Sequence, residues 1–202
     1  MFEYSLALFA HVLVVVYLLG ADLGRLYLAR VGTAENIGLE SLQLAARGVL
    51  WLSSATNLAL VLILPAGISL GAALGAYKIM HPAYFYGTWA VAGVWALISI
   101  SADRVASRAL RITDVVFRLL LAPGFIYDGV IVFTGTSETV DAKWLASKIA
   151  LYGLLIFMSV PMRWVGFGLR TALASNDVDG IQKRLAWMNV PILLGWIVIL
   201  LA

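Results

Sequence analysis

Six long apolar segments, separated by short polar stretches, dominate the 202-residue sequence. A helix that crosses a bilayer needs about 20 mostly apolar residues, because the hydrocarbon core is roughly 30 Å thick and each residue adds about 1.5 Å. Such segments must be helical, since unpaired backbone groups are costly in hydrocarbon. We therefore expect an all-α transmembrane bundle, a single integral membrane domain over residues 1–202, with spans at about residues 4–29, 49–75, 84–102, 112–134, 144–168 and 185–202.

The composition supports a lipid environment. Hydrophobic residues make up 62% of the chain and charged residues 12%, whereas soluble domains carry about 25% charged residues. The net charge of +3 does not indicate nucleic-acid binding, because the basic residues lie between the apolar segments. The absence of cysteine excludes disulfides, thiolate metal sites, iron–sulfur clusters and covalently attached haem. The first apolar run has no basic region before it and exceeds the core of a cleavable signal peptide, so we interpret it as the first span.

The basic residues predict the orientation. With the N-terminus outside, the inner side carries 11 of the 14 basic residues and the outer side carries three. Because cytoplasmic loops are enriched in Lys and Arg, both termini are expected on the non-cytoplasmic side. The inner residues are Arg25, Arg30, Arg47, Arg104, Arg108, Arg111, Arg118, Arg163, Arg170, Lys183 and Arg184, and the outer ones are Lys78, Lys143 and Lys148.

Two features near the second span have alternative interpretations. Residues 35–47 interleave apolar and polar side chains, which is typical either of a short interfacial helix or of the start of the second span. Gly67, Gly71 and Gly75 follow one another at a spacing of four residues. This spacing favours close packing against another helix over room for a flat macrocycle.

Ionisable residues inside the spans are the best indicators of function, because a charge at the centre of a spanning helix costs about 2.5–3.5 kcal/mol on insertion scales. Asp22 and Arg25 are three residues apart, and Asp114 and Arg118 are four apart. Each pair is interpreted as an ion pair within one helix. Residues 53–57 form a polar patch, for which we expect hydrogen bonds between helices.

A second group of polar residues is expected in the outer half of the bundle. Helix direction alone places His11, Asp128 and Lys148 there, where they are candidates for a cofactor or metal site. An intramembrane imidazole is suited to bind haem iron or copper. The alternatives are a hydrogen-bonded His11, an Asp128 that borders the polar edge, and a Lys148 that reaches the headgroups. His81 is interpreted as a solvated loop residue.

Motifs for other chemistry are weak or missing. Met158 and Met162 lie four residues apart, and a thioether pair suits Cu(I), but no cysteine or third methionine joins them. No Ser-His-Asp order and no glycine-rich phosphate loop is present.

Two stretches carry a family resemblance. The first runs from His11 to Gly20 as HVLVVVYLLG, and the second is Trp144-Leu-Ala-Ser-Lys148 at the start of a span. Together with Pro65-Ala-Gly67 they resemble the superfamily that groups the copper-resistance protein D membrane domain, the HemJ-type protoporphyrinogen oxidases and bacterial relatives. The resemblance is confined to the first, second and fifth predicted spans.

The resemblance implies a b-type haem between these three spans in a bacterial inner membrane. His11 would be an axial ligand, Lys148 would lie near a propionate or the iron, and electrons or protons would pass to a quinone or a partner subunit. Two departures argue against bis-histidine ligation and protoporphyrinogen oxidation: the Trp–Lys span comes fifth rather than third, and Met158 and Ser159 stand where a second histidine is expected. The alternatives are a non-catalytic subunit or scaffold, in a larger complex or a homo-oligomer, and a copper transporter.

Overall fold

A computed structural model describes residues 2–77, 82–105, 107–136, 140 and 143–201. Each helix in these ranges is long and apolar enough to cross a membrane. The expected all-α bundle with six spans is therefore confirmed, and the chain is an integral membrane protein. The helices of the described ranges are α1 (Phe2–Gly32), α2 (Leu39–Ala73), α3 (Pro82–Arg104), α4 (Arg108–Thr134), α5 (Lys143–Ala174) and α6 (Val178–Leu201).

The helices extend beyond the apolar segments that predicted them. Residues 39–47 belong to α2, so the second of the two interpretations holds and no separate interfacial helix forms there. α5 and α6 likewise continue through polar residues toward their connection, where Gln43 of α2 donates a hydrogen bond to Asn176 over 3.0 Å. The length of an apolar segment predicts only the part of a helix that lies in hydrocarbon. The backbone hydrogen bonds of the helix continue into the polar interface, so the helix is longer than the segment.

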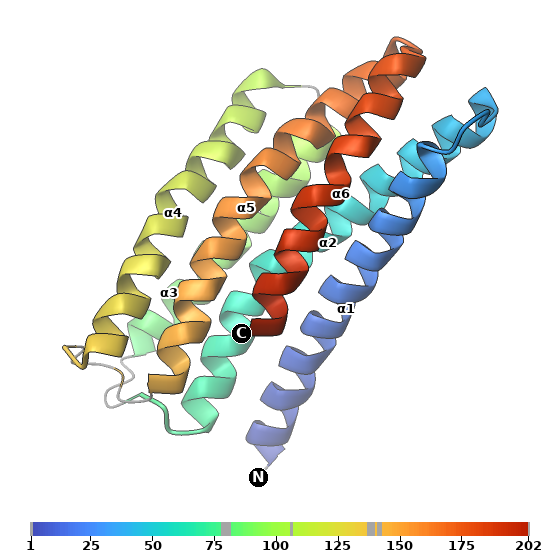
Figure 1. Ribbon diagram of the computed structural model, residues 1–202. Coiled ribbons are helices and arrows are strands. Elements are labelled where there is room, and N and C mark those ends of the chain that lie inside the picture. Colours follow the sequence, from blue (N-terminus) through green and yellow to red (C-terminus); the bar gives the residue numbers. More distant parts are fainter. Residues whose placement is uncertain (1, 78–81, 106, 137–139, 141–142, 202) are drawn as a thin grey trace.

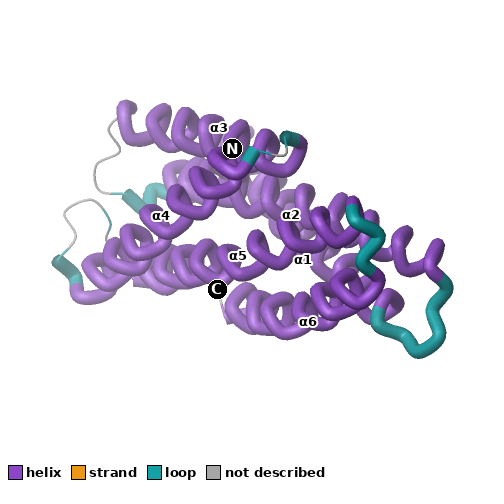
Figure 2. Tube along the Cα trace, turned by 90° about the horizontal axis from the view of Figure 1, so that it is seen from above, coloured by secondary structure: helices purple, strands orange, loops and turns teal. Residues whose placement is uncertain are grey.

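The helices form a closed ring in which neighbours run antiparallel. Each helix packs against the next, α6 returns to α1, and α2 contacts α5 across the middle. The first residues of α1, the last of α6 and the described helix ends between α2 and α3 and between α4 and α5 lie toward one end of the bundle (Figure 1; Figure 2 gives a second view). Residues 33–38 and 175–177 lie at the opposite end, with the end of α3 and the start of α4, and we call it the basic end because Arg30, Arg104 and Arg108 lie there.

A glycine allows α4 and α5 to approach closely, a contact that the spacing of Gly67, Gly71 and Gly75 in α2 did not predict. A Cβ at Gly153 of α5 would lie 2.8 Å from the Ala122 carbonyl oxygen of α4, so the two backbones touch. In the predicted stripe, by contrast, Gly67 faces the His11 ring, Gly71 faces the Tyr77 ring, and Gly75 lies beyond α2 with a φ of 68°. Of these three glycines, Gly67 contacts another helix, α1, whereas Gly71 and Gly75 do not, so the prediction of a helix-packing stripe is confirmed only at Gly67.

Candidate functional site

A buried ion pair on α4 is the centre of a polar network. Asp114 and Arg118 are both 0% exposed, and the Arg118 Nε lies 3.2 Å from Asp114 Oδ2. Their spacing of four residues places both side chains on one helical face. The sequence prediction of this pair is confirmed, and both side chains are fully buried among the helices.

Three further helices supply partners for the Arg118 guanidinium. It donates to Ser159 Oγ of α5 over 2.7 Å, to Ser99 Oγ of α3 over 2.9 Å and to Asn57 Oδ1 of α2 over 3.3 Å. A guanidinium has five N–H donors in a rigid fork, so a buried arginine needs several acceptors in fixed positions. These contacts fix the rotation of four helices relative to one another.

Arg163 of α5 extends the network toward the basic end. Its Nε donates to Asp114 over 2.6 Å and its Nη1 to Asp103 of α3 over 2.7 Å. Asp103 also accepts from Ser54 over 2.8 Å and pairs with Arg170 over 3.1 Å. Positive and negative groups therefore alternate from the bundle interior to the end of α3.

A second ion pair faces the first network from α1. Arg25 Nη1 donates to Asp22 over 2.6 Å, and Thr56 of α2 donates to the same carboxylate over 3.2 Å. This pair, too, was predicted from its spacing and is confirmed. The Arg25 Nε is buried and has no hydrogen-bond partner, although buried polar groups are nearly always paired.

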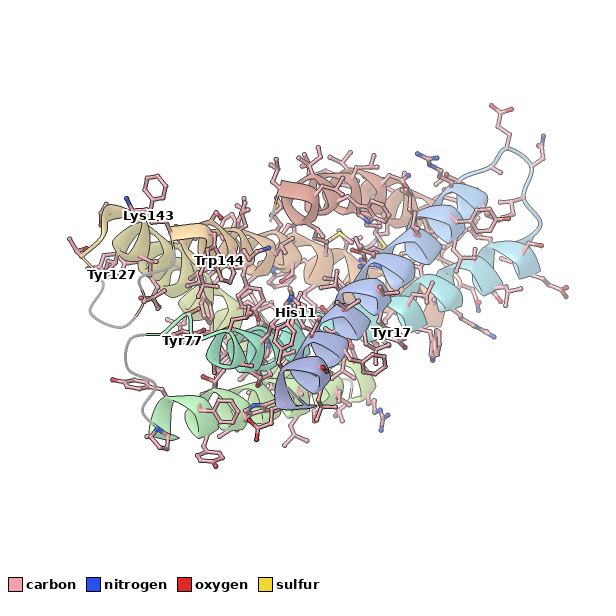
Figure 3. The ribbon with its side chains drawn as sticks, turned by 90° about the horizontal axis from the view of Figure 1, so that it is seen from below. His11, Tyr17, Tyr77, Tyr127, Lys143 and Trp144 are labelled. Atoms are coloured by element: carbon pink, nitrogen blue, oxygen red, sulfur yellow. The ribbon has the colours of Figure 1, made fainter. Side chains whose placement is uncertain are left out.

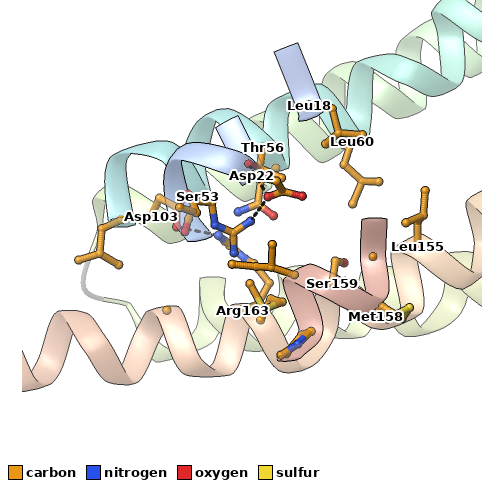
Figure 4. A pocket seen from close by; sticks show the side chains of 18 of the residues that line it. Leu18, Asp22, Ser53, Thr56, Leu60, Asp103, Leu155, Met158, Ser159 and Arg163 are labelled. Carbon is orange, nitrogen blue, oxygen red and sulfur yellow. Dashed lines mark hydrogen bonds and ion pairs between the residues drawn. The ribbon is translucent and has the colours of Figure 1, made fainter. Parts of the chain in front are cut away.

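The two networks border one cavity. It has a volume of about 70 Å³, and Asp22, Arg25, Asp103, Arg163 and Arg170 all line it. Figure 4 shows Asp22 of α1, Asp103 of α3 and Arg163 of α5 approaching the same space. The cavity therefore offers both cationic donors and carboxylate acceptors inside the membrane domain.

Three leucines close the cavity on the side away from the basic end. Leu18 of α1, Leu60 of α2 and Leu155 of α5 lie opposite the charged groups (Figure 4). Leu60 is held in place because its carbonyl accepts a hydrogen bond of 3.0 Å from the Tyr152 hydroxyl. The charged part of the cavity lining therefore lies nearer the basic end, and its apolar part lies nearer the other end.

Arginines outnumber aspartates around this site. A fifth arginine, Arg111, lies 5.1 Å from the centroid of the Phe167 ring, and Arg163 lies 4.7 Å from the same centroid. Arginine stays protonated in proteins, so its charge is not removed by burial. Among the described residues that line the cavity, three arginines face two aspartates, an excess of one positive charge; they are Arg25, Arg163, Arg170, Asp22 and Asp103.

The predicted outer group is only partly brought together. His11 is half-buried on α1, faces Gly67 of α2, and lies within electrostatic range of Lys148 (Figure 3). Its Nδ1 is buried without a hydrogen-bond partner. Asp128 is exposed on α4, a helix that packs against α3 and α5, whereas α1 packs mainly against α2 and α6. His81 and Lys78 lie outside the described residues.

Metal ligands do not gather in the described part of the chain. No group of three or more His, Asp or Glu side chains there is arranged to hold a metal ion, so copper passage gains no support. Met158 and Met162 both line the cavity next to the charged cluster. At that position their side chains form part of the apolar wall of the cavity.

Asp103 and Ser99 were not identified as site residues from the sequence. Arg163 was counted only among the basic residues of the inner side, and its contacts with Asp103 and Asp114 were not predicted. A signal was nevertheless present, because Ser99 and Asp103 are four residues apart, as are Ser159 and Arg163. Each of these pairs occupies one face of its helix, as Asp114 and Arg118 do. Polar pairs at this spacing on three neighbouring spans indicate a shared polar interior.

Comparisons with protein-family models, with curated proteins and with solved structures give no match for this chain.

Proposed function

We propose that this protein is a membrane carrier that binds a small anion in the cavity lined by α1, α2, α3, α5 and α6. The observation that carries the proposal is the Arg25 guanidinium, which lines the cavity and has a buried N–H without a partner. An ionisable group inside a membrane is costly and is by default a functional one. An anion beside Arg25 would satisfy that donor.

The charge balance favours an anion over a cation. One positive charge in excess lines the cavity, and its field is strong because little water surrounds it. Asp103 is already shared between Arg163 and Arg170, at 2.7 and 3.1 Å. A further negative charge would therefore be attracted by arginines that are only partly neutralised.

The cavity volume limits the ligand. A space of about 70 Å³ holds on the order of a few water molecules. Chloride, nitrate, formate and acetate are of the right size, whereas a sugar acid such as gluconate is too large. The substrate class is therefore a small inorganic anion or short carboxylate.

A route across the membrane follows one face of α1. His11, Leu18, Asp22 and Arg25 recur at intervals of seven, four and three residues, which are close to whole helical turns. The leucine layer at Leu18 closes the site from the half that contains His11. A carrier of this design would release the anion toward His11 after the leucines separate.

Binding is tested with the purified protein in detergent. We expect sodium nitrate and sodium formate to raise the melting temperature relative to sodium gluconate at equal ionic strength, because a ligand that binds only the folded state stabilises it. The double variant Asp22→Asn/Arg25→Gln, which keeps shape and removes both charges, should lose this difference. The matched control Arg30→Gln, exposed on the same helix, should keep it.

Transport is tested in proteoliposomes by efflux of radioactive chloride. The wild type and Arg30→Gln should release the anion, and Asp22→Asn/Arg25→Gln should not. If all three proteins melt and leak alike in every anion, the cavity does not bind anions and the proposal is wrong.

A second candidate function is b-type haem binding, as the family resemblance implies. It is favoured by the unpartnered, buried Nδ1 of His11, with Lys148 close by. His11 would be an axial ligand and Lys148 would bind a propionate, while the haem would supply one-electron transfer. A visible spectrum tests it: an α band in the reduced protein that disappears in His11→Ala supports haem, and a protein that stays colourless after incubation with haem excludes it.

A further inference from the structure

A groove on the outer surface of the bundle lies between α5 and α6. It has a volume of about 370 Å³, and none of the residues that line it lines the cavity beside the ionic network. Two cationic and two indole side chains border it, and no acidic residue does; the lining consists of Trp164, Val165, Gly168, Lys183, Arg184 and Trp187.

Arg184 lies flat against α5 because residue 168 is glycine. A Cβ at Gly168 would overlap the Arg184 guanidinium, so any larger residue would push it away. Arg184 Nη1 donates to the Gly180 carbonyl of its own helix over 3.3 Å, which uses one of five N–H donors. The guanidinium is therefore positioned at the groove while it retains donors for a ligand.

The two tryptophans lie deeper along the helices than the two cations. Lys183 and Arg184 follow the start of α6 by five and six residues, and Trp187 follows it by nine. At a rise of about 1.5 Å per residue, the cations lie roughly 8–9 Å and Trp187 roughly 14 Å from the basic end. Trp164 lies at a similar depth on α5, ten residues before Ala174.

This order of side chains matches the order of groups in a phospholipid. We propose that the groove binds an anionic phospholipid, with the phosphodiester between Lys183 and Arg184 and the acyl chains along Trp164 and Trp187. Both indoles are largely exposed, at 59% and 63%, and are available to the chains. Basic pockets between spanning helices recognise anionic headgroups, and tryptophan favours the membrane interface.

Fluorescence quenching by brominated lipids tests the proposal on the whole protein in nanodiscs. Brominated phosphatidylglycerol and brominated phosphatidylcholine are compared at the same mole fraction in a phosphatidylcholine background. The quenching that disappears in Trp164→Phe/Trp187→Phe reports the groove. We expect phosphatidylglycerol to be enriched there roughly tenfold or more over the bulk lipid.

Variants separate a specific site from a generally basic surface. Lys183→Gln/Arg184→Gln should abolish the preference for phosphatidylglycerol. The matched control Arg30→Gln/Arg47→Gln removes two exposed cations from α1 and α2 near the same end and should preserve it.

Three results would overturn the proposal. Equal quenching by the two brominated lipids means that the groove has no headgroup preference. A loss of preference in the control variant as well means that only the overall charge matters. Release of the lipid by excess inorganic phosphate means that the groove takes a free anion. Because anion binding at Arg25 is measured in detergent without these lipids, either proposal can fail while the other stands.

Discussion

Replacing Asp114 with asparagine tests whether the ionic network holds the bundle together. The carboxylate accepts from Arg118 over 3.2 Å, from Arg163 over 2.6 Å and from Ser99 over 2.7 Å, and it is 0% exposed. Asparagine has nearly the same shape and no charge. Arg163 would keep Asp103, but Arg118 would keep only neutral acceptors, namely Ser159, Ser99, Asn57 and the amide oxygen introduced at position 114.

The expected cost follows from the charge that is left unpaired. Removing one partner of a buried ion pair destabilises a protein by about 3–5 kcal/mol. Neutral hydrogen bonds between membrane helices average only about 0.6 kcal/mol. We therefore expect Asp114→Asn to lower the free energy of unfolding by about 3–5 kcal/mol. Arg118→Met should cost less, about 1.5–3 kcal/mol, because Asp114 would remain paired with Arg163.

A double-mutant cycle isolates the interaction. Asp114→Asn/Arg118→Met should be less destabilised than the sum of the two single variants by about 0.5–3 kcal/mol, because it leaves no cation without a carboxylate. The assay is equilibrium unfolding in mixed micelles, followed by circular dichroism. Asp128→Asn is the control, since this aspartate is exposed on the same helix. A cost for Asp114→Asn within about 0.5 kcal/mol of the control would refute the reasoning.

Two further predictions address packing and orientation. Gly153→Ala should destabilise the bundle by about 1–3 kcal/mol, because its Cβ would meet the α4 backbone, whereas Gly93→Ala, which has nothing within 4 Å, should be neutral in the same unfolding assay. Since the chain has no cysteine, single-cysteine variants report the topology cleanly. In intact cells a membrane-impermeant maleimide should label Thr136→Cys and not Ser175→Cys; the reverse pattern would contradict the orientation predicted from the basic residues.

The contacts of the site that could be predicted from the sequence are the ion pairs formed within a single helix. The pairs Asp22–Arg25 and Asp114–Arg118 follow from the helical repeat, and both form as expected. The number of spans followed equally directly, because apolar length alone decides it.

The network between helices could not be predicted in the same way. Arg163 lies inside the fifth apolar segment, but a charge near the basic side of a span is usually an interfacial one. Its pairing with Asp103 and Asp114 depends on the rotation of α5 and on its place in the ring. Those two quantities are fixed by contacts among all six helices; the polar pairs at a spacing of four residues indicate a polar interior, but they do not specify which groups pair across helices.

The glycine pattern shows a related limit. Equal spacing places Gly67, Gly71 and Gly75 on one face only while the helix continues, and α2 ends at Ala73. The close approach formed instead at Gly153, where the α4 backbone supplies the complementary surface. Small residues permit close contact, but the partner helix decides which of them make it.

The most direct test of the central claim is a crystal structure of the protein grown with sodium bromide. Bromide replaces a small anion and is located by its anomalous scattering. The account predicts an anomalous peak in the cavity within hydrogen-bonding distance of Arg25 Nε, and no such peak in crystals of Asp22→Asn/Arg25→Gln. A cavity that shows only water beside Arg25, with bromide bound elsewhere on the protein, would contradict it.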